Sequence, residues 1–259
     1  ASPIAFRWID SYVDLDDAQS LVARGALDET VAWHRRTQLP DYVELLGRAE
    51  SEVLADTTPE RVCAWVGESR SRAEPILQFL APAITDVALT LAPAQFAHIE
   101  KRFTQTNEEF RDEHLQRNPR WRQRAATERA VERAEMLYGK LDDAQRALIA
   151  DSVRTSPYDA ERVDAERKLR QQEALVFFRR LRAANPGREE ALLEVRAYLR
   201  VLDHSPRETY RVYAERVIAH DCALASALQN AASAEERRNA AQKLGGWRDD
   251  LRALSRDGA

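Results

Sequence analysis

Glycine and proline are scarce in this chain, with 8 glycines and 10 prolines among 259 residues. Proteins rich in strands need glycine-bearing turns at short intervals, so this composition excludes a strand-rich fold. Alanine, leucine, glutamate and arginine dominate instead, and these are strong helix formers. No apolar run approaches the roughly 20 residues that a membrane-spanning helix needs. The sequence therefore predicts an all-α protein, a multi-helix bundle or extended array of about ten amphipathic helices without a sheet.

Lysine is also rare, at four of the 39 basic residues, and the rest are arginine. Acidic residues are interleaved with the arginines almost everywhere, and the net charge is −4. Such mixing leaves no large basic face of the kind that binds a phosphate backbone. We therefore expect no nucleic-acid partner.

The motifs of catalysis and metal binding are missing from the chain. None of the five histidines lies three residues after a glutamate or four residues from another histidine, so the helical metal motifs are absent. The sequence also has no Gly-rich phosphate loop, no Gly-x-Ser-x-Gly elbow and no dinucleotide fingerprint. We expect no catalytic residues, no metal and no cofactor, and hence no enzyme.

Only two cysteines are present, Cys63 and Cys222, and they form no Cys-x-x-Cys pair. Two cysteines permit one disulfide. Two free, buried thiols fit the spacing equally well, so the residues alone leave both states open.

Helical periodicity runs along nearly the whole chain. Pro75 and Pro82 should kink or split the segment 59–89. We treat 1–259 as one elongated domain, in which the Asn-Pro-Gly step makes 184–188 the best place for a subdivision. The predicted helices cover 3–13, 16–38, 41–56, 59–89, 93–116, 120–140, 143–155, 159–184, 188–203, 206–231 and 234–255.

A short pattern, Leu-x-x-x-Gln, recurs at three predicted helix starts. In this pattern an aspartate following the leucine caps the free N–H groups of the first turn, and the glutamine reaches back to complete a capping box. Degenerate copies occur at 58–60 and 232–236. The residues that carry the pattern are the caps Asp16 and Asp142 and the first-turn residues Gln19, Gln95 and Gln145.

Four segments, 12–19, 33–40, 91–95 and 107–111, occur in an order that resembles a family of uncharacterised, all-helical proteobacterial lipoproteins. The resemblance spans residues 6–254. It implies a periplasmic protein tethered to the outer membrane through an acylated cysteine, which this chain lacks. A disulfide between Cys63 and Cys222 would be plausible in that compartment. The helix starts also resemble, more weakly, the Leu-Thr-x-x-Gln motif of small periplasmic chaperones.

Our leading hypothesis is a non-enzymatic periplasmic lipoprotein that binds protein or envelope components, with a chaperone-like role as one form of such binding. A structural or assembly subunit of an envelope complex is the alternative, and a hydrolase with a scattered site is a third. Binding would use a groove bordered by the helices 16–38 and 93–116. Aromatic residues at helical spacing are more often part of a packed core, in which Trp33 would be buried and Arg36 would pair with Glu109. The candidate binding residues are Trp33, His34, Arg36, Asn107, Glu109 and Phe110.

Overall fold

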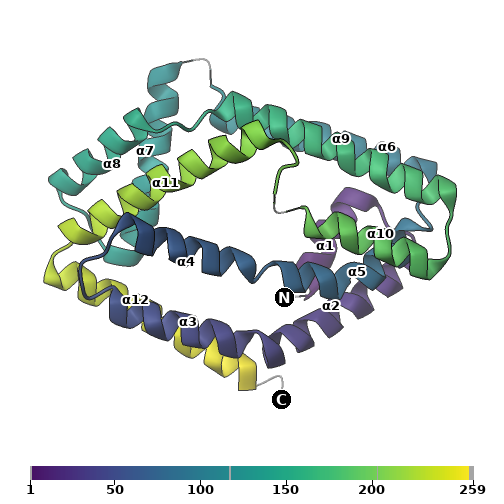
Figure 1. The fold of residues 1–259 in the computed structure, drawn as a ribbon, viewed down its shortest axis with the longest axis horizontal. Coiled ribbons are helices and arrows are strands. Elements are labelled where there is room, and N and C mark those ends of the chain that lie inside the picture. The colour runs from purple at the N-terminus through teal and green to yellow at the C-terminus, as the bar shows by residue number, and fades with distance from the viewer. Residues whose placement is uncertain (1, 117, 203, 257–259) are drawn as a thin grey trace. The chain divides into compact units, whose positions relative to one another are not determined.

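The computed structural model describes residues 2–116, 118–202 and 204–256, and these residues form twelve α-helices and no strand (Figure 1). The prediction of an all-α fold is therefore confirmed. The helices are α1 Ser2–Val13, α2 Asp17–Thr37, α3 Leu39–Glu52, α4 Pro59–Ser71, α5 Glu74–Ala88, α6 Pro93–His114, α7 Pro119–Tyr138, α8 Asp143–Thr155, α9 Ala160–Ala184, α10 Arg188–Arg200, α11 Glu208–Ala231 and α12 Ala234–Arg256.

The two prolines of the predicted 59–89 segment behave differently. The helix breaks between Ser71 and Glu74, so that Pro75 lies in the first turn of α5, where its missing N–H costs nothing. Pro82 remains inside α5. The split at the first proline turns one predicted helix into two.

The chain divides into two compact units, each built from three separate segments. Unit 1 comprises 1–32, 72–115 and 159–210, and unit 2 comprises 33–71, 116–158 and 211–259. The step at 184–188 is the turn between α9 and α10, inside unit 1, where Asn185 adopts a left-handed conformation (φ 44°) at the end of α9. The boundaries between the units therefore fall elsewhere.

Unit 1 is held by helix pairs that are distant in sequence. α5 packs against α10, and α6 packs against both α1 and α9 (Figure 1). Between α5, α9 and α10 lies a core of small and branched side chains, and a second core joins α6 to α9. The buried residues of these two cores are Ala81, Ala88, Leu91, Phe96, Leu175, Leu181, Ala191, Val195 and Leu199.

Unit 2 is dominated by the packing of α3 along α12, and α7 packs against α8 and α12. The helices α3 and α12 approach closely at Gly245, where an added Cβ would meet the Glu50 carboxylate at 2.9 Å. In the core, the Tyr138 hydroxyl donates to Gln229 (2.7 Å), whose amide nitrogen donates to the carbonyls of Val53 and Ala55. These bonds join α7 and α11 to the end of α3.

All three Leu-x-x-x-Gln copies begin helices. The side chains of Gln19 and Gln145 accept from the N–H of their cap residues, and Asp16 and Asp142 accept in return at 2.8 Å. Gln95 makes the same bond to Ala92 N–H (2.9 Å), but alanine offers no acceptor, so only half of the box forms. The three glutamines are buried, although the three residues that precede each of them are exposed.

In unit 1 the two glutamines of different helix starts bind each other. Gln95 Nε2 donates to Gln19 Oε1 at 2.6 Å and to the carbonyl of Asp14 at 2.8 Å, and Gln19 Nε2 donates to Gln95 Oε1 and to Thr90 Oγ1. Backbone partners fix which amide atom is oxygen and which is nitrogen. The starts of α2 and α6 are therefore locked together by four side-chain bonds.

The same arrangement recurs in unit 2, with glutamate in place of one glutamine. Glu236 completes a capping box with Ser233 at the start of α12 and accepts from Gln145 Nε2 at 3.0 Å. Gln145 also donates to the carbonyl of Ala231, two residues before the cap, as Gln95 does to Asp14 two residues before Asp16. Glu236 is thus the counterpart of Gln19, and Gln145 the counterpart of Gln95.

Removing the cap of α8 should cost about 1 kcal/mol of stability in the variant Asp142→Ala, because the N–H of Gln145 loses its acceptor. Chemical unfolding monitored by circular dichroism measures this loss. Asp143→Ala is the matched control, since Asp143 lies one residue further on and makes no capping bond of this kind. An equal loss in the two variants would contradict the role of Asp142 as the cap.

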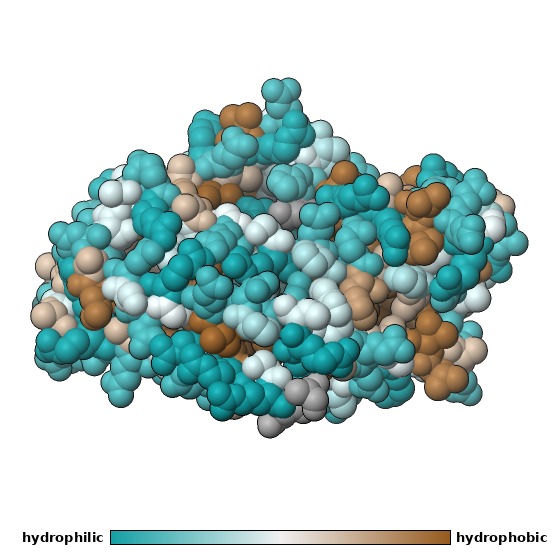
Figure 2. Space-filling model, turned by 60° about the horizontal axis from the view of Figure 1, so that its bottom comes forward, coloured by the Kyte–Doolittle hydropathy of each residue, from teal (hydrophilic) through white to brown (hydrophobic). Residues whose placement is uncertain are grey.

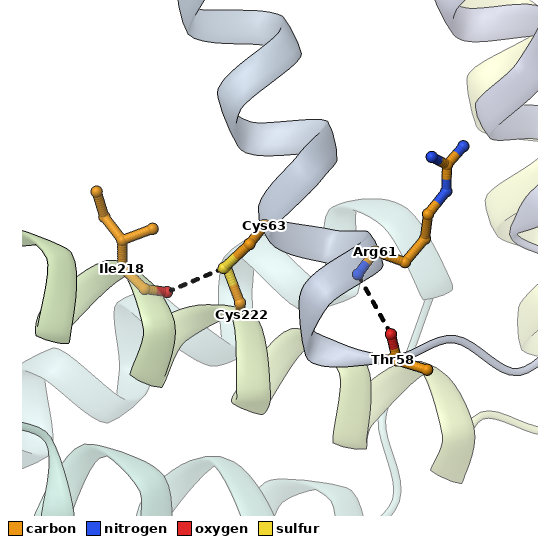
Figure 3. Close-up of a disulfide and its surroundings, with 5 residues drawn as sticks. All are labelled: Thr58, Arg61, Cys63, Ile218 and Cys222. Atoms are coloured by element: carbon orange, nitrogen blue, oxygen red, sulfur yellow. Dashed lines mark hydrogen bonds between the residues drawn. A yellow bond between two sulfur atoms is a disulfide. The ribbon is translucent and has the colours of Figure 1, made fainter.

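Cys63 and Cys222 form a disulfide that ties α4 to α11 within unit 2 (Figure 3). Their Cα atoms are 5.5 Å apart, and 159 positions separate them in sequence. Cys63 Sγ lies 4.0 Å from the carbonyl oxygen of Ile218. This is a van der Waals contact and not a hydrogen bond, because a sulfur in a disulfide carries no proton to donate. None of the residues of α4 is fully buried, so this bond is a principal attachment of the helix.

Candidate functional site

An open pocket of about 420 Å³ lies within unit 1. Its volume is within the range of ligand sites. Four helices contribute: α9 supplies most of the lining, α10 and the turn after it a second wall, and α6 and the start of α11 the remainder. The lining residues are Phe103, Val163, Glu166, Arg167, Arg170, Gln171, Ala174, Tyr198, Leu202 and Tyr210.

The α9 residues of the pocket lie between Val163 and Ala174, and each has another lining residue three or four positions away. Such offsets place side chains on one face of a helix. Two neighbours on this face are arginines, Arg167 and Arg170. The pocket therefore has a basic stripe along one wall and aromatic or aliphatic side chains around it.

Both arginines of the stripe are anchored by backbone carbonyls. Arg167 donates to the carbonyl of Thr106 at 3.0 Å and lies over the ring of Phe110, and Arg170 donates to the carbonyl of Leu202. Within the described ranges, neither forms an ion pair with a carboxylate. Since a guanidinium has five N–H donors, most of the donors of each remain for other partners.

The acidic residue of the pocket is fully engaged. Glu166 accepts two bonds from Arg207, at 2.6 and 2.7 Å, and Arg207 also pairs with Glu173. The bond from Arg207 outweighs burial and lowers the pKa of Glu166, while the two glutamates raise the pKa of Arg207. Glu166 is therefore a fixed carboxylate at neutral pH.

The aromatic ring of Tyr198 lines the pocket on the side formed by α10. Its ring stacks on Phe177 with centroids 4.3 Å apart and an interplanar angle of 9°. Burial raises the pKa of Tyr198, so its hydroxyl is protonated at neutral pH. The ring offers a rigid apolar surface with one polar tip.

The predicted contact residues of α6 lie behind the pocket wall. Asn107 exchanges two hydrogen bonds with Gln171, at 2.7 and 3.1 Å, and Phe110 lies under Arg167. Glu109 is exposed and contributes nothing to the lining. Asn107 and Phe110 thus hold two lining side chains in place.

The other three predicted contact residues belong to unit 2. Trp33 and His34 are half-buried, and Arg36 is exposed. His34 Nδ1 lies 2.7 Å from Gln38 Oε1, and its ring meets Tyr42 edge-on. The pocket takes Phe103 from the predicted 93–116 helix and no residue from the predicted 16–38 helix.

The sequence interpretation missed the arginines and tyrosines of the pocket. The one available signal was the run of lining positions at helical spacing from 163 to 174, which includes two arginines three residues apart. Interleaved acids such as Glu173 made this face resemble an ordinary solvated surface.

Apolar side chains on the surface are dispersed. Figure 2 shows a mostly hydrophilic face with separate small hydrophobic patches. Ile4 and Trp8 are exposed one turn apart on α1, with exposed fractions of 68% and 63%. In the part of the chain that the structure describes, no helix combines the length and apolarity that crossing a bilayer requires. Those same residues contain no cluster of three or more histidine, cysteine or acidic side chains able to hold a metal.

The fold and pocket define an all-helical protein with an arginine-lined apolar site. The chain belongs to a family of unknown function (DUF6279), whose sequence profile it matches over residues 11–202. This range includes nine of the ten lining residues, all except Tyr210. No curated protein and no solved structure matches the chain.

Proposed function

We propose that this protein is a non-enzymatic binding protein of the periplasm, which holds apolar segments of proteins or envelope components in the unit 1 pocket. The main support for this proposal is the lining of the pocket. Its aromatic and aliphatic lining suits an apolar ligand, and its few polar groups are fixed in position, as in ligand sites generally.

The disulfide supports the proposed compartment. Disulfides persist in oxidising environments and are rare in the cytosol. The bond joins two helices whose cysteines are far apart in sequence, so it restrains a large part of the unfolded chain. A periplasmic location, with a lipid tether to the outer membrane as in the lipoproteins that the sequence resembles, is consistent with such a bond.

The polar groups of the pocket favour binding over catalysis. A general acid or base works best when its pKa lies near the operating pH. The pKa of Glu166 is shifted down by Arg207 and that of Tyr198 is shifted up by burial, so both shifts lead away from neutrality. These side chains are suited to hold a ligand rather than to transfer its protons.

Filling the pocket should weaken binding. We expect fluorescein-labelled decapeptides rich in Leu and Phe to bind the protein in anisotropy titrations, and Ser/Gly-rich decapeptides to bind weakly. Ala174→Trp should weaken binding of the apolar peptides by at least about tenfold, because the indole occupies the lined space. Ala197→Trp, at an exposed position of α10, is the matched control and should bind as the native protein does.

Failure of the native protein to bind any apolar decapeptide would overturn the proposal. The alternative is an assembly subunit of an envelope complex, and the exposed pair Ile4 and Trp8 on α1 favours it. In that case peptide binding would be absent, and Trp8→Ser would disrupt co-purification with the complex.

A further inference from the structure

The geometry of the pocket points to one ligand class, and this inference rests on the proposed function. We infer that the pocket captures the C-terminal end of an apolar peptide, with Arg167 and Arg170 binding the terminal carboxylate. The last side chain of the peptide then packs against Phe103, Tyr198 and Leu202.

The charges around the pocket specify a single negative group. Arg207 is hydrogen-bonded to both Glu166 and Glu173. Arg170 acts on Glu166 through its charge without a direct ion pair, and within the described residues Arg167 forms no ion pair with a carboxylate. Three arginines and two glutamates leave one positive charge uncompensated. A carboxylate cancels this charge, whereas a phosphate monoester would bring up to two negative charges.

The two arginines are also pre-organised for a carboxylate. They lie three residues apart on one face of α9, a spacing that brings side chains next to each other. One donor of each guanidinium is tied to a backbone carbonyl, so less side-chain freedom is lost when a ligand binds. The remaining donors can form the paired N–H bonds to a carboxylate that arginine favours.

The open form of the pocket favours a peptide end over a fatty acid. The lined space is about 420 Å³ and is open to solvent, so it covers a short apolar group and leaves the rest of a ligand in water. A long alkyl chain would remain partly hydrated and gain little there. A peptide places its last side chain in the pocket, and its polar backbone continues into solvent.

The experiment compares one peptide with two chemical ends on the native protein. The probe is a fluorescein-labelled hexapeptide that ends in Leu-Val-Phe, with either a free carboxylate or an amide. We expect amidation to weaken binding by at least about tenfold, the usual size of a charge-assisted hydrogen bond. Raising the salt concentration should weaken the carboxylate peptide and leave the amide nearly unchanged.

Variants locate the effect. Arg170→Gln should lower the affinity for the carboxylate peptide to that of the amide, and Arg170→Lys should recover part of it, because lysine keeps the charge without the planar fork. Arg200→Gln is the matched control, at an exposed arginine of α10 outside the pocket, and should have no effect. If Arg170→Gln does not fold, the amide comparison on the native protein still decides.

The outcomes separate the two proposals. Equal binding of the free and amidated peptides overturns the carboxylate inference and leaves the proposed function standing. No binding of either peptide, or of the apolar decapeptides, overturns both. Dodecanoate that displaces the peptide and binds more tightly than it does would overturn the assignment to a peptide end.

Discussion

Unit 2 should lose about 3–5 kcal/mol of stability when the Cys63–Cys222 disulfide is removed in the double variant Cys63→Ala/Cys222→Ala. The bond closes a loop of 159 positions and so removes much of the freedom of the unfolded chain. α4 contains no fully buried residue, so little apolar packing compensates for the missing bond. Urea unfolding, with hydrogen exchange resolved by helix, measures both the loss and its location.

Protection should fall first in α4, residues 59–71, when the bond is absent. The native protein treated with a phosphine reductant is the control, and it should unfold at nearly the same urea concentration as the double variant. A stability loss below about 1 kcal/mol, with protection in α4 unchanged, would show that the ion pairs of Arg61 and Arg48 suffice to hold the helix.

Gln95→Glu should destabilise unit 1 by about 2–4 kcal/mol, measured by chemical unfolding. Gln95 Nε2 donates to Gln19 Oε1 and to the carbonyl of Asp14, so a carboxylate would place oxygen against two acceptors in a buried site. Gln19→Glu should cost less. The oxygen that replaces Gln19 Nε2 still meets Gln95 Oε1, but its other neighbour is the hydroxyl of Thr90, which can turn to donate, whereas the carbonyl of Asp14 beside Gln95 cannot.

The counterpart pair in unit 2 supplies the control. Glu236 occupies the position of Gln19 and is stable there as a carboxylate. Burial raises its pKa, but the bonds from Ser233 and Gln145 outweigh burial, so its pKa lies below the ordinary value. Glu236→Gln should therefore stay within about 1 kcal/mol of the native protein. Equal losses in Gln19→Glu and Gln95→Glu would contradict the equivalence of the two pairs.

Local chemistry made the helix starts predictable from the sequence. Asp16 and Asp142 cap helices at the expected places because a cap needs only its own first turn. Pro75 marks the start of α5 for a similar reason, since its ring is tolerated in a first turn. Each of these features depends on residues within four positions of one another.

Features that depend on distant residues were not predictable in the same way. The bond between Gln19 and Gln95 joins positions 76 residues apart, and nothing near either glutamine identifies its partner. The pocket requires the 163–174 face of α9 to meet Tyr198 and Phe103, which periodicity alone does not establish. Likewise, the sequence positions of the two cysteines did not decide between a disulfide and free thiols, because that depends on the tertiary fold.

The alternation of the two units along the chain determines when each can fold. The path changes unit after Ala32, Ser71, Leu115, Tyr158 and Tyr210. A nascent chain of 158 residues therefore carries only two of the three segments of either unit. Contacts between distant segments can form only after the later segment has been made, so unit 1 can complete its fold once residue 210 has been synthesised, and unit 2 only near the end of the chain. Truncation after residue 158 should accordingly yield a fragment in which neither core is finished, whereas truncation after residue 210 removes only the last segment of unit 2. Neither unit can be produced alone as one continuous stretch of sequence.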